Sequence, residues 1–256
     1  MAKVRVLVLR APGTNCDDET VFAFQQAGGE VSSVHVNRLI RHEERLADYR
    51  IMVIPGGFTY GDDIAAGKVL ANELRLKLGE EILRFIEEGG LILGICNGFQ
   101  VLVKAGFLPD PTKGSASSVT LTNNDSGKFE CRWIHLEANR NSPCVFTQGV
   151  GRMYLPVAHG EGKLVALPGL LVEGSIALRY IDEEGNNRAR YPHNPNGSVD
   201  NIAGICDDSG RIFGLMPHPE RCLRGTQHPQ WTRLGAKKYG DGFQVFRNAV
   251  RWARSL

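Results

Sequence analysis

Long hydrophobic runs, an excess of one charge and closely spaced cysteines are all absent from this sequence of 256 residues. No apolar run approaches the ~20 residues of a membrane-spanning helix, so we expect no such helix. A formal net charge of +2 provides no basic field for nucleic acid. The first residues lead directly into a strand-like stretch, so we expect no signal peptide. The six cysteines form no C-x-x-C pair, which predicts free thiols in a cytoplasmic protein.

The first half of the chain alternates between two hydrophobic periodicities. Apolar stretches predict strands at Val4–Leu9, Val31–His35, Ile51–Ile54 and Leu91–Ile95. Helical spacing predicts helices at Asp17–Gly28 and Leu74–Glu88. Strands that alternate with helices predict an α/β fold with a doubly wound, mostly parallel sheet flanked by helices.

The chain changes character after residue 110, where short β segments replace this alternation. These segments are Val119–Thr122, Lys128–Leu136, Gly151–Pro156, Ser175–Tyr180, Ile202–Cys206 and Arg211–Met216. The last two predict a hairpin, and Gly242–Ser255 predicts a final helix. Because no convincing linker or internal repeat is visible, we expect residues 1–256 to form a single domain with added β segments in its C-terminal half.

The most informative stretch is Gly94-Ile95-Cys96-Asn97-Gly98, between an apolar strand and an amphipathic helix. It is the nucleophile-elbow pattern G-x-S-x-G with sulfur in place of oxygen. The turn would place the thiol at the carboxyl end of a strand and at a helix N-terminus, where partial positive charge favours the reactive thiolate. The pattern is short, so a buried structural cysteine is a comparable interpretation.

A second feature favours the catalytic interpretation. The apolar run that ends at Met216 is followed at once by Pro217-His218-Pro219-Glu220-Arg221. A cysteine nucleophile needs a base, and the base needs a third group that holds its tautomer. His218 and Glu220 supply both types from one strand end, and the two prolines stiffen the segment.

Three further motifs bear on the chemistry. Pro55-Gly56-Gly57 follows a predicted strand, so its glycine N–H groups are candidate oxyanion donors, although an ordinary turn is the alternative. Gly61–Lys68 lacks the spacing of a phosphate-binding loop, which predicts no ATP site in this chain. His159-Gly160-Glu161-Gly162 lacks a third ligand and helical zinc spacing, so we expect a loop at the edge of the site and no metal.

Taken together, these motifs resemble those of the class I glutamine amidotransferases that carry a cysteine triad. Gly94–Gln100 and Pro217–Glu220 carry the resemblance to the family. The match is nearer to the members that serve purine biosynthesis, through further stretches between residues 10 and 221. These are Arg10–Asn15, Pro55–Asp62, Asn124–Glu130, Pro156–Gly162, Asn196–Ser198 and Pro217–Arg221.

The resemblance implies a flavodoxin-like fold and a glutaminase whose catalytic triad is Cys96, His218 and Glu220. It places the oxyanion donors at Gly57 and Asn97, and assigns Gln100 to binding of the substrate glutamine. It also implies a partner synthetase subunit that would hold ATP and Mg²⁺. A small third subunit is a further candidate partner. The chain itself would carry no cofactor.

Two departures from the family pattern stand out. Thr59 follows Phe58 where serine is commoner, and Cys222–Gly242 is a long segment before the last helix. Alternatives to this function are a glutaminase that feeds another synthetase, a stand-alone cysteine hydrolase on a related sheet, and a regulatory domain without catalysis. The last class would have lost a triad residue, whereas all three are present here.

Overall fold

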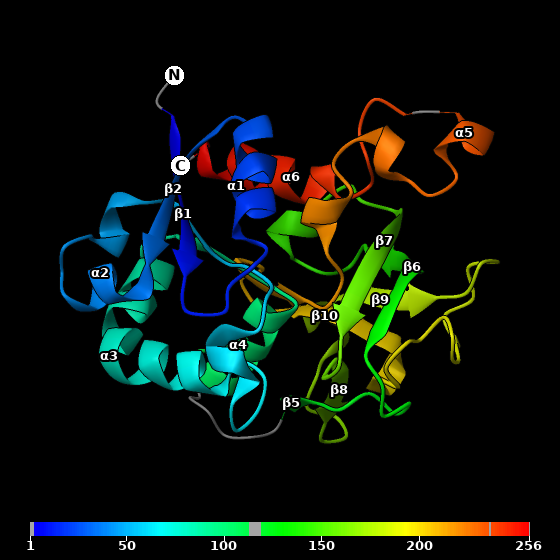
Figure 1. Cartoon of the computed structure of the whole chain (residues 1–256), viewed down its shortest axis with the longest axis horizontal. Coiled ribbons are helices and arrows are strands. Elements are labelled where there is room, and N and C mark those ends of the chain that lie inside the picture. Colours follow the sequence, from blue (N-terminus) through cyan, green and yellow to red (C-terminus); the bar gives the residue numbers. More distant parts are fainter. Residues whose placement is uncertain (1–2, 113–118, 236, 256) are drawn as a thin grey trace.

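The computed structural model describes residues 3–112, 119–235 and 237–255, and one large sheet runs through it (Figure 1). The order of its strands is β2-β1-β3-β4-β11-β10-β9-β6-β7, and β5 and β8 form a separate pair. The strands are β1 (Val4–Arg10), β2 (Gly29–His35), β3 (Ile51–Ile54), β4 (Leu91–Ile95), β5 (Val119–Thr122), β6 (Glu130–Ala138), β7 (Arg152–His159), β8 (Lys163–Ala166), β9 (Ile176–Ile181), β10 (Ile202–Cys206) and β11 (Ile212–Leu215). The helices are α1 (Asp17–Gln26), α2 (Val36–Ile40), α3 (Lys68–Glu87), α4 (Asn97–Ala105), α5 (Trp231–Leu234) and α6 (Phe243–Ala253).

Half of the sheet is parallel and half is antiparallel. The strands from β2 to β11 pair in parallel, as expected for strands joined by helical crossovers. From β11 onward, through β10, β9, β6 and β7, the pairing is antiparallel. The predicted hairpin of β10 and β11 is therefore confirmed, and most of the added β segments of the C-terminal half extend the same sheet.

Helices cover both faces of the parallel half, which confirms the doubly wound α/β prediction. α1 and α6 lie together on one face, where Phe24 and Phe246 meet edge to face with ring centroids 5.1 Å apart. α3 and α4 lie together on the other face. The central strands β3 and β4 are buried along their whole length, because helices exclude water from both of their faces.

The sequence located most elements, and its errors lie at element ends and in short segments. α3 begins at Lys68, well before the expected start at Leu74, because Gly67 (φ 73°) turns the chain into a first helical turn that buries Leu70. α2 and β8 were not predicted, since each is too short to show a period. All six cysteines are free thiols. Within the described ranges, no helix combines the length and the apolar character needed to cross a bilayer.

Candidate active site

Cys96 lies at the tight turn between β4 and α4, in a backbone conformation that few residues adopt (φ 51°, ψ −104°). Glycines make this turn possible. A Cβ on Gly98 would lie 1.9 Å from the carbonyl oxygen of Ile54, and one on Gly94 would lie 2.6 Å from that of Gly98. The strained conformation is held by its surroundings, as is common at functional sites.

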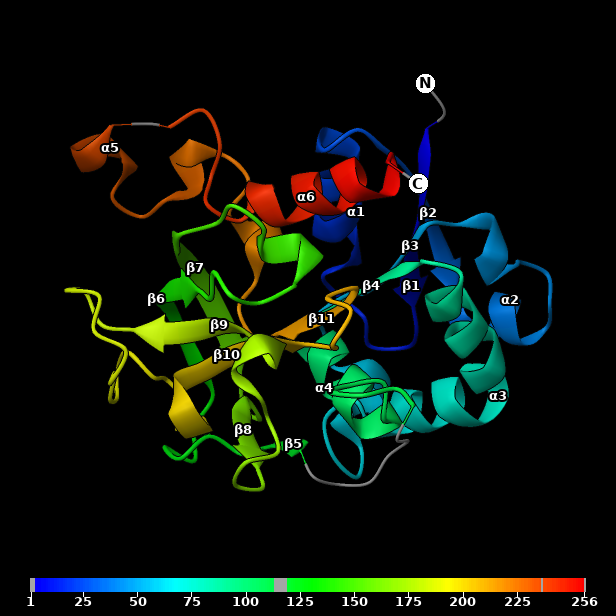
Figure 2. The same ribbon diagram turned by 180° about the vertical axis from the view of Figure 1, so that it is seen from behind.

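His218 reaches the same edge of the sheet because β11 pairs in parallel with β4 (Figure 2). The register pairs Leu215 with Ile95, so both chains leave the sheet side by side. The N–H of His218 donates to the carbonyl of Pro156 at 2.9 Å. Its Nδ1 lies 2.5 Å from Oε1 of Glu220, and both side chains are buried.

The charges around His218 favour its protonated form. Burial lowers the pKa of this imidazole, but the negative charges of Glu220 and Cys96 outweigh burial, and the nearby sulfur atoms of Cys16 and Cys96 act in the same direction. The pKa of His218 is therefore raised well above its ordinary value. Because Nδ1 is held by Glu220, Nε2 is the nitrogen left to exchange a proton with Cys96.

Two backbone N–H groups, those of Gly57 and Asn97, are the expected oxyanion donors. Gly57 forms an isolated antiparallel bridge with Thr14, but the hydrogen bonds of that bridge use the carbonyl of Gly56 and the N–H of Phe58. The N–H of Gly57 is therefore not used by the bridge. Asn97 is the first residue of α4, where a backbone N–H has no partner inside the helix.

The side chain of Asn97 joins the elbow to the Gly-rich loop Pro55–Gly67. Its Oδ1 accepts hydrogen bonds from the Thr59 hydroxyl at 2.7 Å and from the Thr59 N–H at 3.2 Å. Its Nδ2 donates to Asp62 at 3.1 Å and to Gln100 at 2.9 Å. Gln100 in turn donates to the carbonyl of Glu161 at 2.6 Å, so both ends of its carboxamide already contact protein groups.

The loop Pro55–Gly67 and the turn His159–Gly162 are linked by a polar contact that we call the clasp, formed by Ala66, Lys104 and Glu161. The carboxylate of Glu161 lies 3.3 Å from the N–H of Ala66 and 3.3 Å from Nζ of Lys104, which also donates to the carbonyl of Ala66 at 2.6 Å. Burial lowers the pKa of Lys104 although Glu161 opposes this shift.

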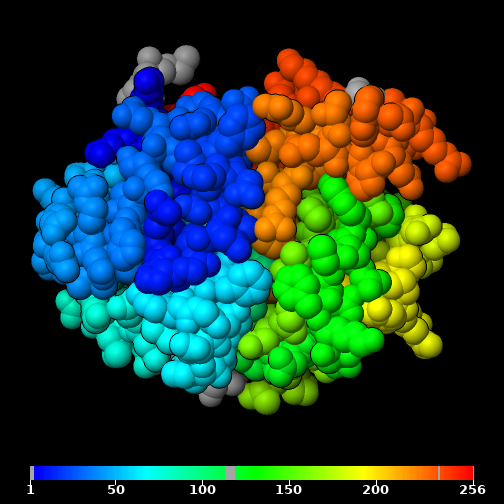
Figure 3. Space-filling model, in the orientation of Figure 1, coloured from blue at the N-terminus to red at the C-terminus, as the bar shows by residue number. Residues whose placement is uncertain are grey.

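Only 5% of Cys96 is exposed to solvent beneath these segments. Figure 3 shows the cyan atoms of the Gly-rich loop lying directly against green atoms of the C-terminal half. Across that boundary Phe58 packs against Phe129, with ring centroids 6.3 Å apart. The thiol of the free chain is therefore largely covered.

His159 is at the end of β7 and is held as a neutral imidazole. Nδ2 of Asn124 donates to the carbonyls of Lys128 and His159, both at 2.8 Å, so its Oδ1 faces Nδ1 of His159 at 3.1 Å. Because that oxygen only accepts, Nδ1 carries the proton. Burial, together with the positive charge of His218, lowers the pKa of His159 to about 4.

One group of possible metal ligands occurs among the described residues. The ligand atoms of Cys16, His218 and Glu220 lie within 4.8 Å of one another. However, Nη2 of Arg221 donates to the sulfur of Cys16 at 3.0 Å. A fixed guanidinium at this position opposes a bound cation, so the arrangement favours acid–base and nucleophilic chemistry.

Sequence reasoning missed Cys16, Arg221 and the clasp as parts of the site. A signal for Cys16 was available, because the segment 11–15 follows the carboxyl end of β1, and parallel strands bring such ends together. The sequence placed Glu161 in a loop expected at the edge of the site, but no comparable signal exists for Lys104, which is far from Glu161 in sequence and meets it only after folding.

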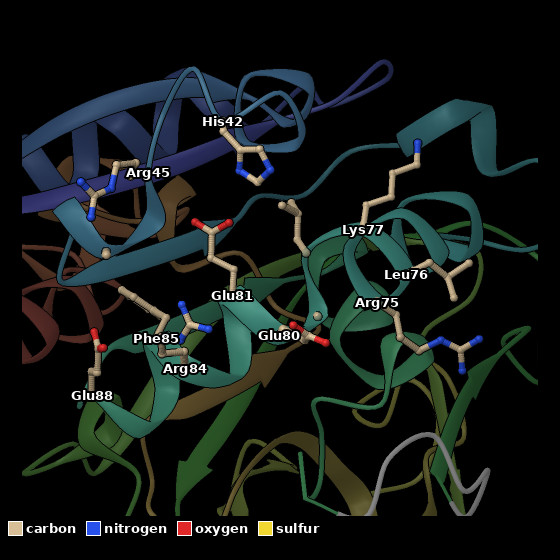
Figure 4. A pocket seen from close by; sticks show the side chains of 13 residues that line it. His42, Arg45, Arg75, Leu76, Lys77, Glu80, Glu81, Arg84, Phe85 and Glu88 are labelled. Carbon is tan, nitrogen blue, oxygen red and sulfur yellow. The ribbon is translucent and has the colours of Figure 1, made fainter.

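A separate hollow of about 520 Å³ lies along the outer side of α3 (Figure 4). Charges of both signs surround it, including Arg45, Glu81 and Arg84. Cys96, His218 and Glu220 do not line this hollow, so it is not part of the candidate site.

Comparison with known proteins agrees with the geometry of the elbow. Residues 3–253 match the sequence profile of the CobB/CobQ-like glutamine amidotransferase domain. The chain belongs to this family. The amidotransferase is 58% identical, over the full length of both chains, to "Phosphoribosylformylglycinamidine synthase subunit PurQ" of Dehalococcoides mccartyi. It is 39% identical to the subunit of the same name from Pyrococcus furiosus, again over the full length of both chains.

Solved structures give the same family and fold. A chain in the structure of PurLQS from Thermotoga maritima is 34% identical to the amidotransferase, with a TM-score of 0.75, and the match covers 98% of this chain and 99% of that one. Another glutamine amidotransferase from Thermotoga maritima is 17% identical with a TM-score of 0.52, which shows a shared fold only. That match covers 91% of this chain and 83% of the other.

Proposed function

We propose that this amidotransferase is the glutaminase subunit of phosphoribosylformylglycinamidine synthase, with Cys96, His218 and Glu220 as its catalytic triad. The contact between His218 and Glu220 beside the strained elbow of Cys96 is the observation that carries the proposal. The names of the full-length relatives support the choice of complex.

In the first step the Cys96 thiolate attacks the side-chain carbonyl carbon of glutamine. The developing oxyanion accepts hydrogen bonds from the N–H groups of Gly57 and Asn97, which are worth roughly 3–4 kcal/mol of barrier each. The C–N bond breaks as protonated His218 gives its proton to the departing nitrogen through Nε2. Ammonia leaves, and a γ-glutamyl thioester remains on Cys96.

In the second step a water molecule attacks the thioester, and neutral His218 takes its proton. The C–S bond breaks, glutamate leaves, and the Cys96 thiolate and protonated His218 are restored. Glu220 keeps the proton-bearing Nδ1 turned toward itself and stabilises the positive charge of His218 in both steps. Gln100 shapes the glutamine site by fixing the carbonyl of Glu161.

Ammonia then passes to a separate synthetase subunit, which binds ATP, Mg²⁺ and formylglycinamide ribonucleotide and forms formylglycinamidine ribonucleotide. The solved relative carries the name of an assembly, PurLQS, which supports two partners for this chain, the synthetase and a small third subunit. A chain that releases ammonia without using it would waste glutamine, which is a chemical reason for such a partner.

The proposal is tested by combining the purified chain with the synthetase and following amidination of formylglycinamide ribonucleotide. Cys96→Ala and Cys96→Ser are expected to abolish synthesis from glutamine but to preserve synthesis from ammonium salts. Cys131→Ala is the matched control, since its thiol is exposed whereas that of Cys96 is buried. Glutamine-dependent synthesis by Cys96→Ala would refute the role of the nucleophile.

A further inference from the structure

A second thiol, Cys16, lies close to the pair formed by His218 and Glu220 and has no role in the mechanism above. It immediately precedes α1, and only 1% of it is exposed. Its Sγ and the ligand atoms of His218 and Glu220 lie within 4.8 Å of one another. Cys16 is therefore as deeply buried as the pair that it contacts.

The sulfur of Cys16 uses both of its hydrogen-bonding capacities. Its S–H donates to Oδ1 of Asn15 at 3.2 Å, and it accepts from Nη2 of Arg221 at 3.0 Å. A side chain that cannot both donate and accept would leave one of these groups without a partner. The bond from Arg221 crosses from the loop after β1 to the segment that carries the catalytic histidine.

Arg221 follows Glu220 in sequence, and its position depends on the contact with Cys16. Nε of Arg221 lies 3.9 Å from Oε1 of Glu220, the same oxygen that bonds to His218. The guanidinium thus adds a positive charge behind the carboxylate, at a place set by the sulfur. Losing the sulfur would free Arg221, whose side chain is about one-third exposed, to turn toward solvent.

Gly56 lies against both Cys16 and His218. A Cβ at this glycine would lie 2.8 Å from Cε1 of His218 and 3.2 Å from Sγ of Cys16. The N–H of Cys16 also donates to the carbonyl of Gly56 at 3.2 Å. The thiol and the imidazole ring therefore both pack on Gly56, near the start of the loop Pro55–Gly67, so we expect a change at the sulfur to move the ring.

We propose that Cys16 is a positioning residue that holds Arg221 and the ring of His218 in line with Glu220 and Cys96. This inference rests on the proposed function, because it assigns Cys16 an effect on the acid–base chemistry of that site. Cys16 itself forms no bond to the substrate. Its contribution is the alignment of the pair and the charge state of His218.

The charged and titratable groups around His218 determine how pH reports this role. They are Glu220 and Arg221 on its own segment, Cys16 before α1, Cys96 at the elbow and His159 at the end of β7. The sulfur of Cys16, whose S–H points to Asn15, presents its electron-rich side to the imidazole of His218, and this proximity raises the pKa of His218. Cys16→Ala should therefore lower that pKa, and the thiolate–imidazolium pair should be lost at a lower pH.

The experiment follows the rate of carbamidomethylation of Cys96 by iodoacetamide between pH 5 and 10, read by mass spectrometry of the peptide that contains Cys96. In Cys16→Ala, the alkaline limb, where His218 loses its proton, should shift down by about half a pH unit, as expected for loss of one weak polar contact. Cys16→Ser, which can still donate and accept, should keep the alkaline limb close to its wild-type position.

Steady-state glutaminase assays on the same variants form the second measurement. Cys16→Ala should lower kcat about tenfold with little change in KM for glutamine, since alignment of the base and not substrate binding is altered. Cys144→Ala is the matched control, because that thiol is fully buried but pairs with Cys206 rather than with a residue of the site. It should leave both kcat and the pH profile unchanged.

The outcomes separate this inference from the proposed function. Cys16→Ala with the wild-type profile and wild-type kcat would overturn the positioning role and leave the triad intact. A fall in kcat without a shift of the limb, and with no rescue by Cys16→Ser, would also overturn it, because that is the effect of a packing defect. Absence of glutaminase activity in the wild-type complex would instead contradict the proposed function.

Discussion

The N–H of Ala66 and the carboxylate of Glu161 meet at 3.3 Å, although 95 positions separate these residues in the chain. Their contact joins the loop Pro55–Gly67 to the turn His159–Gly162 above a thiol that is 5% exposed. We infer that glutamine reaches Cys96 only when these segments separate, and that the clasp favours a covered site in the free chain.

We therefore predict that the isolated chain is a poor glutaminase that gains activity on binding the synthetase. A partner that selects an open arrangement with the N–H of Gly57 facing the substrate would supply an oxyanion donor worth ~100–1,000-fold in rate. The measurement is steady-state glutamate release with and without saturating synthetase and its ligands. Equal rates would contradict gating by the partner.

Glu161→Gln should weaken the clasp and so reduce the difference in glutaminase rate between the isolated chain and the complex with the synthetase. Loss of the charge on Glu161 removes a charge-assisted contact with Lys104, which should raise glutamate release by the isolated chain by up to about tenfold. Glu137→Gln is the control, since it removes an exposed partner of Arg152 away from the site. Unchanged activity in Glu161→Gln would show that the clasp does not limit access.

His218→Ala and Glu220→Gln should differ in severity. Removing His218 deprives both steps of their acid and base, so kcat should fall as far as in Cys96→Ala. Glutamine at position 220 can still accept the bond from Nδ1 but lacks the charge that raises the pKa of His218, so the loss should be about 10–100-fold smaller. Single-turnover thioester formation and hydrolysis would measure both. A larger loss in Glu220→Gln would reverse the assigned roles.

Gly98→Ala should disrupt the elbow, because its Cβ would lie 1.9 Å from the backbone oxygen of Ile54, which cannot turn away as a side chain can. We expect a loss of roughly 1–3 kcal/mol in the free energy of unfolding and little residual activity. Gly79→Ala, in α3, has its nearest contact at 4.0 Å and should stabilise the protein by about 0.5–1 kcal/mol. Urea denaturation of both variants checks the contrast, and equal stabilities would refute it.

The low pKa of His159 predicts a loss of stability in mild acid. Its pKa is 6.5 in an ordinary setting and about 4 here, so the unfolded chain binds the extra proton between these pH values. Stability is therefore retained above pH 6.5 and falls as pH drops toward 4, by up to about 3 kcal/mol. In His159→Gln, which can still donate to Asn124, this part of the pH dependence should vanish from urea titrations. His42→Asn, at an exposed position, should keep it.

Local sequence determined the parts of this protein that depend on short-range physics. Continuous apolar runs predicted β3 and β4 to the residue, since strands buried on both faces admit few polar side chains. The glycines around Cys96 predicted the elbow, because only residues without a Cβ fit that close to β3. His218 and Glu220 are two positions apart, so their meeting was also a local matter.

Only the tertiary structure decided what surrounds these groups. The sequence alone could not show that the antiparallel strands extend the parallel sheet, because pairing partners depend on long-range register. Nor could it show that Arg221 reaches back to Cys16 across 205 positions, or that Lys104 on α4 meets Glu161. Contacts of this kind leave no periodicity in the chain, since each is formed only when separate strand ends converge at one edge of the sheet.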